Sequence, residues 1–404
     1  MTDRIVRIEA LRIAAHRDYV SSAGLRAPAM PGGGDARVLN RNTGRHVCIY
    51  ATQAETLLVK ITTDSGLVGW GEAHSPPVPR VSQALVEDLL APQLVGRDPL
   101  AVQAHWDRLY NSMRLRGHNT GFMMEALAGV DIALWDLTGK ILGQPIYRLL
   151  GGPFGVADEA ETVRVPCYAS GVPGATLDER LEAAEAFIAR GFTAMKLSIG
   201  RGSFDEDLEQ AEAVARAIAG RAHLTVDAHG CYDARTAVSA ARRLEAAGVR
   251  WLEDPLPPED LDGYAALCAA VDLPIANGET ECTRWQFEEK LRRGAADVIL
   301  PDVCRAGGIS ETHRIALVAD LHNVPWCAHV STCSSVHLAA SLHLAAATPN
   351  FAICEYPNPL NPNPLGDPLL QQPLRYEAGH LLVPDGPGLG IAFDEEALAA
   401  HVVP

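Results

Sequence analysis

The 404-residue sequence lacks the closely spaced cysteine pairs that mark zinc sites and disulfide-rich secreted proteins. It contains no Cys-x-x-Cys pair, and its nine cysteines are spread along the chain, at positions 48, 167, 231, 268, 282, 304, 327, 333 and 354. An odd number of scattered cysteines is typical of reduced thiols. We therefore expect a soluble, cytoplasmic protein without disulfide bonds.

Long apolar runs and positive charge are also scarce. The sequence has no run of about 18 apolar residues that could span a bilayer, and no signal-peptide core follows Met1. Only 34 Lys and Arg residues stand against 50 Asp and Glu residues, which gives a formal net charge of −16. Such a negative field repels nucleic acids and anionic membranes, so we expect neither as a partner.

The second half of the chain alternates short apolar segments with helical stretches. Eight segments share this pattern: Val163–Ser170, Phe192–Gly200, His223–Gly230, Val249–Leu256, Leu273–Glu279, Asp297–Val303, Val324–Val330 and Phe351–Tyr356. Alternating strands and helices predict parallel strands joined by right-handed crossovers. Eight units predict an α/β fold, a (β/α)8-type (TIM-like) barrel.

The segment before the barrel has a different pattern, typical of an α+β capping domain. Residues 57–64 and 67–72 alternate around a Ser65-Gly66 turn and predict a hairpin. Helical periodicity follows at residues 81–90, 101–110 and 123–142. A Gly- and Pro-rich stretch at residues 27–35 predicts a mobile loop, either a substrate lid or a disordered connection.

The chain after Pro357 is rich in proline and contains a short strand-like segment at residues 379–383. We expect this tail to return to the N-terminal unit. The predicted division is a capping domain over residues 1–130, a barrel over residues 131–357 and the tail over residues 358–404.

Carboxylates recur at the predicted strand ends, where the active sites of such barrels lie. Asp227, Glu253 and Glu279 are 26 residues apart at each step, which is one β/α unit. A single such carboxylate is more often a helix cap, but three at equivalent positions indicate a site. Because gathered carboxylates repel one another, a hard divalent cation with oxygen ligands is expected, and Mg²⁺ is the natural choice.

Two histidines complete the predicted site. His329 ends the seventh strand and Asp302 the sixth, so the carboxylate can fix one ring nitrogen and leave the other for substrate. His229 lies two residues after Asp227 and faces the same way. Three other histidines are expected to be ordinary core or surface residues: His105, His322 and His343.

These residues lie in motifs that together resemble the enolase superfamily, in its mandelate racemase-type subgroup. The motifs are Gly129-Val-Asp-Ile-Ala-Leu-Trp-Asp-Leu-Thr-Gly-Lys140, Ala194-Met-Lys-Leu-Ser, Val226-Asp-Ala-His-Gly, Trp251-Leu-Glu-Asp-Pro-Leu, Asn277-Gly-Glu, Pro301-Asp-Val and Gly307-Gly-Ile-Ser. The resemblance covers essentially the whole chain. It implies a homo-oligomeric enzyme that uses Mg²⁺ to abstract the proton next to a carboxylate.

The resemblance also implies a role for each residue. Asp227, Glu253 and Glu279 would bind Mg²⁺, and the His329–Asp302 dyad would be a general base or acid. Two further residues would act on the substrate: Lys196 as a clamp on its carboxylate, and Glu355 as a hydrogen-bonding partner of the enediolate oxygen.

One departure narrows the activity. Ser198 stands where the subgroup usually has a second lysine as acid or base. Sequences that resemble galactonate dehydratase also lack this lysine and carry a histidine two residues after the first metal ligand, as His229 does here. The resemblance therefore implies a hydro-lyase that dehydrates a sugar acid (an aldonate or aldarate) to a 2-keto-3-deoxy acid.

Three alternatives stay open at this point. A racemase or epimerase, or a lactone cycloisomerase, would use the same enediolate, and a non-catalytic homologue would only bind a sugar acid. The sequence does not specify the sugar acid. Candidates for its recognition are Tyr19, Arg45, His46 and His74, each of which singly is more often an ordinary surface or core residue.

Overall fold

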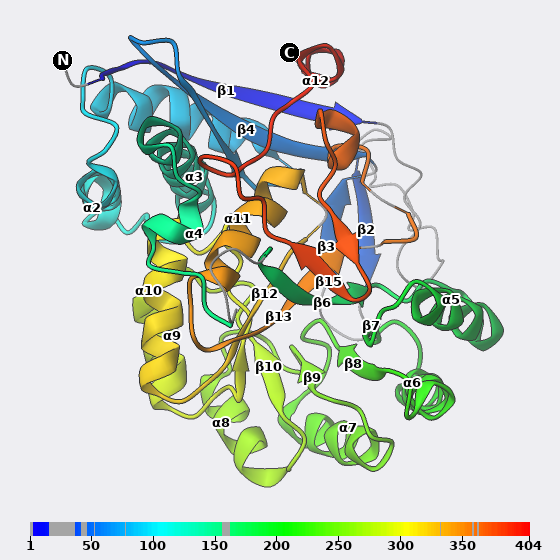
Figure 1. Cartoon of the computed structure of the whole chain (residues 1–404). Coiled ribbons are helices and arrows are strands. Elements are labelled where there is room, and N and C mark those ends of the chain that lie inside the picture. The colour runs from blue at the N-terminus through cyan, green and yellow to red at the C-terminus, as the bar shows by residue number, and fades with distance from the viewer. Residues whose placement is uncertain are drawn as a thin grey trace.

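The computed structural model in Figure 1 describes residues 3–15, 37–41, 47–51, 53–76, 78–155, 162–331, 333–357, 359–361 and 363–404. The Gly- and Pro-rich stretch at residues 27–35 lies outside these ranges, so the prediction of a mobile loop is untested.

The predicted eight-stranded barrel is confirmed. Its parallel strands are β6 (Arg164–Ser170), β7 (Ala194–Ser198), β8 (His223–Asp227), β9 (Leu252–Glu253), β10 (Ile275–Asn277), β11 (Val298–Ile299), β12 (Trp326–Ala328) and β13 (Phe351–Pro357). Each strand pairs with the next along the chain, and β13 pairs with β6 to close the ring. The carboxyl ends of all eight strands therefore meet at one mouth.

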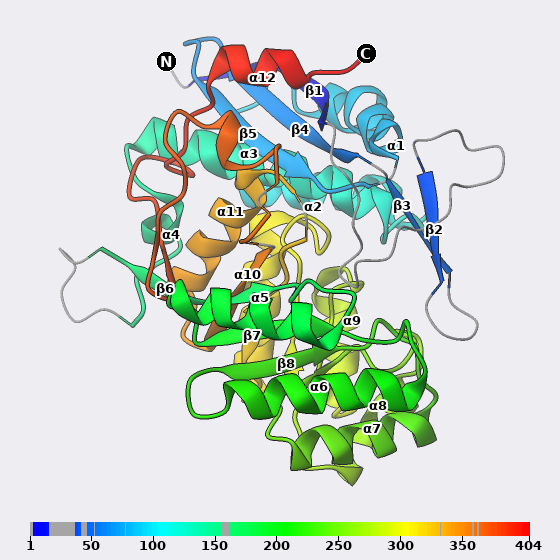
Figure 2. The same cartoon turned by 90° about the vertical axis from the view of Figure 1, so that its right-hand side faces the viewer.

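Seven helices follow the first seven strands and cover the outside of the barrel (Figure 2): α5 (Leu177–Ala189), α6 (Phe204–Ile218), α7 (Ala234–Ala246), α8 (Leu261–Ala270), α9 (Thr283–Arg292), α10 (Gly308–Leu321) and α11 (Ser335–Ala346). Local sequence sets several of their starts. Thr176 and Ser203 each form a capping box with a glutamate three residues on. Helix α11 is buried along its whole length, because the capping unit and the tail cover its outer side.

The capping unit contains the predicted hairpin. Strands β4 (Ala54–Thr63) and β5 (Val68–Ala73) pair antiparallel, and β1 (Ile5–Ala15) adds to β4. Helix α3 (Phe122–Leu142) packs directly on β5, because glycines leave room for its backbone. A Cβ at Gly71 would lie 1.9 Å from the Gly129 carbonyl oxygen.

The capping unit contains several further elements. They are β2 (Arg37–Arg41) and β3 (Val47–Ala51), which form a separate two-stranded ribbon, then α1 (Pro79–Ala84), a π-helical turn (Leu85–Leu90), a 3-10 turn (Ala91–Gln93), α2 (Val102–Arg114) and α4 (Ile146–Leu149). The helix predicted over residues 81–90 is thus α1 continued by the π-helical turn. None of the helices in the described ranges is long and apolar enough to cross a membrane.

The tail contacts the barrel before it contacts the capping unit. After a 3-10 turn (Asp367–Leu369) and the short strand β14 (Tyr376–Glu377), β15 (His380–Leu382) pairs antiparallel with the start of barrel strand β6. Further on, the tail reaches the capping unit: the Leu389 N–H donates to Asp136 Oδ1 of α3 at 2.8 Å, and the ring of Phe393 lies 4.9 Å from that of Trp70 in β5. Helix α12 (Glu395–His401) then lies beside β1 (Figure 1), and Val402 bridges Ile13. The start of β6 offers unpaired backbone groups that the strand-like segment satisfies before the chain reaches the cap.

Candidate active site

Lys196 lies at the centre of the carboxylates at the barrel mouth. Its Nζ is 2.7 Å from Glu253 Oε1, 2.8 Å from Glu355 Oε1 and 3.4 Å from Asp227 Oδ2. These four residues come from β7, β8, β9 and β13, and their side chains are all buried. The structure thus brings together a lysine and three carboxylates that are far apart in the sequence.

Burial dominates the electrostatics of this cluster. It raises the pKa of Asp227 to about 6 and that of Glu253 to about 7, although Lys196 lowers both. Burial alone would lower the pKa of the Lys196 ammonium, but Glu253 and Glu355 hold that pKa well above its ordinary value. The lysine is therefore a fixed cation, and the carboxylates around it carry more negative charge than it neutralises.

His329 lies between two carboxylates. Its Nδ1 is 2.8 Å from Asp302 Oδ2 and its Nε2 is 3.0 Å from Glu279 Oε2. Burial would lower the pKa of the imidazole, but Glu279 and Asp302 hold this pKa well above its ordinary value. The backbone N–H of Cys304 donates to Asp302 Oδ1 at 2.8 Å and helps to fix the carboxylate. The predicted pairing of His329 with Asp302 is present.

His229 reaches the mouth from the other side of the barrel. Strands β8 and β12, which carry His229 and His329 just beyond their ends, are four positions apart in the ring of eight. His229 Nδ1 is 3.1 Å from Asp227 Oδ1, and its backbone N–H donates to the same oxygen at 3.0 Å. Its side chain is 25% exposed. Burial of the rest of the ring disfavours the charged form and lowers the pKa of His229 to about 4.

Glu355 is fixed by two donors. The Ser170 hydroxyl donates to its Oε1 at 2.5 Å, and the Val330 N–H donates to its Oε2 at 2.9 Å. Burial would raise the pKa of Glu355, but Lys196 and His329 hold this pKa below its ordinary value. The carboxylate is therefore ionised while Lys196 contacts it.

The sequence reasoning missed three residues of this region. They are Ser170, Arg305, which donates from Nη1 to the Glu279 carbonyl oxygen at 3.3 Å, and His337, whose Nε2 is 3.2 Å from Asp302 Oδ1. Ser170 ends a predicted strand, and Arg305 follows Asp302 by three residues, so their positions carried a signal. His337 lies in an apolar helix, where nothing in the sequence separated it from a core histidine.

Other predicted residues lie elsewhere. Ser198 is buried and is the register partner of Asp227. His74 is only 1% exposed, and its ring packs against that of His337 with centroids 5.9 Å apart, so it lies behind the mouth. Tyr19, Arg45 and His46 lie outside the described residues.

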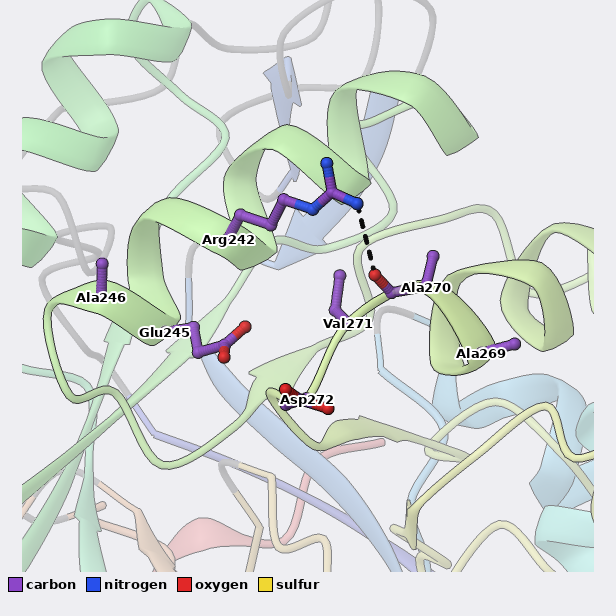
Figure 3. A pocket seen from close by; sticks show the side chains of 7 residues that line it. All are labelled: Arg242, Glu245, Ala246, Ala269, Ala270, Val271 and Asp272. Carbon is purple, nitrogen blue, oxygen red and sulfur yellow. Dashed lines mark hydrogen bonds between the residues drawn. The ribbon is translucent and has the colours of Figure 1, made fainter.

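One pocket among the described residues lies away from the mouth. It has a volume of about 520 Å³ and lies between the C-terminal ends of α7 and α8, lined by Arg242, Glu245, Ala246, Ala269, Ala270, Val271 and Asp272 (Figure 3). Each of these helices ends where the next strand begins, so the pocket lies at the N-terminal ends of the strands. The active sites of such barrels lie at the opposite, C-terminal ends. This pocket is therefore not the candidate active site.

Comparisons with known proteins agree with this geometry. Residues 179–397 match the family described as enolase C-terminal domain-like, and residues 37–151 match the mandelate racemase / muconate lactonizing enzyme N-terminal domain. The chain belongs to this family of the enolase superfamily. The resemblance predicted from the motifs is confirmed, and the chain is an enzyme of this class.

Three similar proteins illustrate the range of the family. D-galactarolactone cycloisomerase from Agrobacterium fabrum is 38% identical over 86% of this chain and 91% of its own length. Arabinonate dehydratase from Saccharolobus solfataricus is 34% identical over 83% of this chain and 87% of its own length. A crystal structure of an enolase superfamily member from Agrobacterium tumefaciens superposes with a TM-score of 0.89 at 30% identity and covers 99% of both chains.

Proposed function

We propose that this protein is a Mg²⁺-dependent dehydratase that removes water from a sugar acid to give a 2-keto-3-deoxy acid. The observation that carries the proposal is the placement of two histidines on opposite sides of one carboxylate cluster. His329 and His229 lie just beyond the ends of strands four positions apart, and Ser198 stands two residues after Lys196, where the subgroup usually has a second lysine. One histidine can remove a proton while the other protonates a leaving hydroxyl.

The donor chemistry of the site fits Mg²⁺. Asp227, Glu253 and Glu279 offer only carboxylate oxygens, from three adjacent strands, in a region where burial alone makes ionised carboxylates costly. We assign these three residues to the ion. When bound there, Mg²⁺ would stabilise the negative charge that develops on the substrate carboxylate.

Lys196 and Glu355 act on the same end of the substrate. The buried ammonium of Lys196 is a fixed positive charge that would bind the substrate carboxylate. When Lys196 engages the substrate, Glu355 loses the contact at 2.8 Å that favours its ionised form. A proton on Glu355 then allows it to donate a hydrogen bond to the developing enediolate oxygen.

His329 is the base in this proposal. Asp302 accepts the Nδ1 proton, so Nε2 is the atom that would take the C2 proton of the substrate. Glu279, 3.0 Å from Nε2, raises the pKa of the ring and favours a proton there. With Glu279 bound to the ion, that carboxylate would no longer favour the charged ring, and Nε2 could act as a base. His229 is the acid that protonates the departing 3-hydroxyl group. Burial favours its neutral form, so it must first take up a proton, and both Asp227 and the anionic substrate beside it would favour that step.

Cycloisomerisation of a sugar-acid lactone is the second candidate. It is favoured by the 38% identity to D-galactarolactone cycloisomerase, which exceeds the 34% identity to arabinonate dehydratase. Both reactions begin with removal of the proton next to the carboxylate. They differ in what leaves: a hydroxyl group in dehydration, and the ring oxygen of the lactone in cycloisomerisation.

A panel experiment separates the possibilities. The purified protein is incubated with Mg²⁺ in deuterated water with D-arabinonate, D-xylonate, D-galactonate, galactarate and D-galactarolactone, and the products are read by NMR. A 2-keto-3-deoxy acid supports the proposal. Product formation from the lactone alone supports the cycloisomerase, deuterium exchange without elimination supports an epimerase, and no reaction with any compound contradicts all three.

Two variants test the assigned roles. His329→Asn should abolish exchange at C2, whereas His229→Asn should retain exchange and lose dehydration. Full turnover by His229→Asn would refute its assignment as the acid. The cytoplasmic location and the homo-oligomeric state stay predictions, which fractionation and light scattering would test.

A further inference from the structure

His337 lies directly behind the proposed base and its carboxylate. It is in the first turn of α11 and is completely buried. Its Nε2 is 3.2 Å from Asp302 Oδ1 and 3.2 Å from the His329 carbonyl oxygen. Both neighbours are acceptors, so Nε2 must carry a proton, and this N–H faces both members of the pair.

This contact determines which oxygen of Asp302 faces the base. Oδ1 accepts from the Cys304 N–H and lies against His337, while Oδ2 is 2.8 Å from His329 Nδ1. With Oδ1 held on two sides, the carboxylate cannot rotate without breaking buried hydrogen bonds. The ring of His74 packs against the ring of His337 and restricts its movement in turn.

A second buried carboxylate holds His337 in place. Glu72 of β5 is 0% exposed, and its two oxygens accept from four donors of two different units. Thr56 Oγ1 donates at 2.7 Å from the capping sheet. Three donors come from the start of α11: the Ser334 N–H at 2.9 Å, the Ser334 hydroxyl at 2.6 Å and the His337 N–H at 3.2 Å. An anion at a helix N-terminus is also favoured by the helix dipole.

We propose that His337 is a positioning residue for the His329–Asp302 pair and that Glu72 of the capping unit holds it there. The role rests on the proposed function, because it matters for activity only if this pair moves the substrate proton. Removing a residue that orients a catalytic group typically lowers activity 10- to 100-fold.

The chain offers a matched control on the same helix. His343 is six residues further along α11 and is also completely buried. Its ring stacks on Tyr147 with centroids 5.8 Å apart, and its Nδ1 accepts from the Tyr147 N–H at 3.4 Å. Within the described residues it makes no hydrogen bond or ion pair with His329 or Asp302, so His343→Phe reports the cost of changing a buried α11 histidine alone.

The first test is kinetic. His337→Phe should lower kcat about 10- to 100-fold with little change in KM on the panel acid that reacts fastest. His337→Gln, whose amide can place an N–H near the position of Nε2, should recover most of this loss. His343→Phe should keep kcat within about twofold. Equal losses in the Gln and Phe variants, or an equal loss in His343→Phe, would overturn the proposal.

The second test needs no substrate. In protein labelled with ¹⁵N-histidine, the Nδ1–H proton of His329 bonded to Asp302 is identified as the imidazole resonance lost in His329→Asn. This resonance should shift or broaden in His337→Phe and stay in place in His337→Gln and His343→Phe. An unchanged resonance in His337→Phe would overturn the proposal. A shifted resonance in a protein that transforms no panel acid would support the positioning role and contradict only the proposed function.

Discussion

Asp131 of α3 accepts two hydrogen bonds from one residue of the barrel. Its Oδ2 accepts the backbone N–H of Ser310 at 2.8 Å, and its Oδ1 accepts the Ser310 hydroxyl at 2.6 Å. The same hydroxyl oxygen accepts the indole N–H of Trp135 at 2.9 Å. Because Ser310 lies in the first turn of α10, these bonds join the long helix under the capping sheet to a barrel helix.

This arrangement predicts a pH-dependent stability. Burial raises the pKa of Asp131 to about 7, so the folded protein retains a proton that the unfolded chain releases near pH 4. The free energy of unfolding should therefore fall as the pH rises from about 4 to 7, by up to about 1.4 kcal/mol per pH unit for this one group. Asp131→Asn should reduce that slope, measured by urea unfolding at several pH values. Asp178, which is exposed, is the control. If Asp131→Asn left the pH dependence of the unfolding free energy unchanged, or if Asp178→Asn changed it equally, the assignment to Asp131 would be contradicted.

The clamp role of Lys196 predicts a large loss of activity without loss of the fold. Lys196→Met removes the buried positive charge that contacts Glu253 and Glu355. Loss of one preorganised electrostatic partner typically costs about 100- to 1000-fold in kcat. Activity on the reacting panel acid would be compared with that of Lys140→Met, which removes an ion pair with Asp136 far from the mouth. A kcat near that of the wild type would refute the assignment.

The assigned ligand set predicts a measurable affinity for Mg²⁺. Glu253→Gln replaces one carboxylate of the proposed set and should weaken Mg²⁺ binding about tenfold or more in calorimetric titrations of chelator-treated protein. Chelation should also abolish turnover, and added Mg²⁺ should restore it. The control Glu185→Gln removes an exposed carboxylate that pairs with Arg221. Equal affinity in both variants would exclude Glu253 from the set.

Because α3 packs closely on β5, one added methyl group at this contact should strongly lower the free energy of unfolding. In Gly71→Ala the new Cβ would lie 1.9 Å from the Gly129 carbonyl oxygen, so the helix must move away from the sheet. We expect a loss of about 3 kcal/mol or more in the free energy of unfolding. In Gly366→Ala the nearest atom is 3.3 Å away, and this control should lose much less. Similar unfolding midpoints for the two variants would contradict the proposed packing.

The sequence predicted the barrel well because each β/α unit repeats a local signal. All eight predicted segments contain a strand, and the hairpin before the barrel is present. The residues at the strand ends were also predictable, because topology alone brings the ends of parallel strands to one mouth. The roles assigned to them and the domain limits after residues 130 and 357 stay predictions.

Contacts between units could not be predicted in the same way. The pairing of β15 with β6 and the contact of His337 with Asp302 depend on how distant segments pack. A buried histidine in an apolar helix has the same sequence pattern whether it packs against Tyr147, as His343 does, or against a carboxylate. The two histidines differ only in their tertiary contacts, and the periodicity of the helix sequence does not predict those contacts.

The four hydrogen bonds that Glu72 accepts have a consequence for engineering this enzyme. An exchange of capping domains between relatives would treat the barrel as if it alone carried the chemistry. Here a carboxylate of the capping sheet anchors the helix that lies behind the proposed base, His329. A chimera that exchanges β4 and β5 without an acceptor in place of Glu72 should fold with a loosened α11, so the useful boundary for grafting lies outside these two strands.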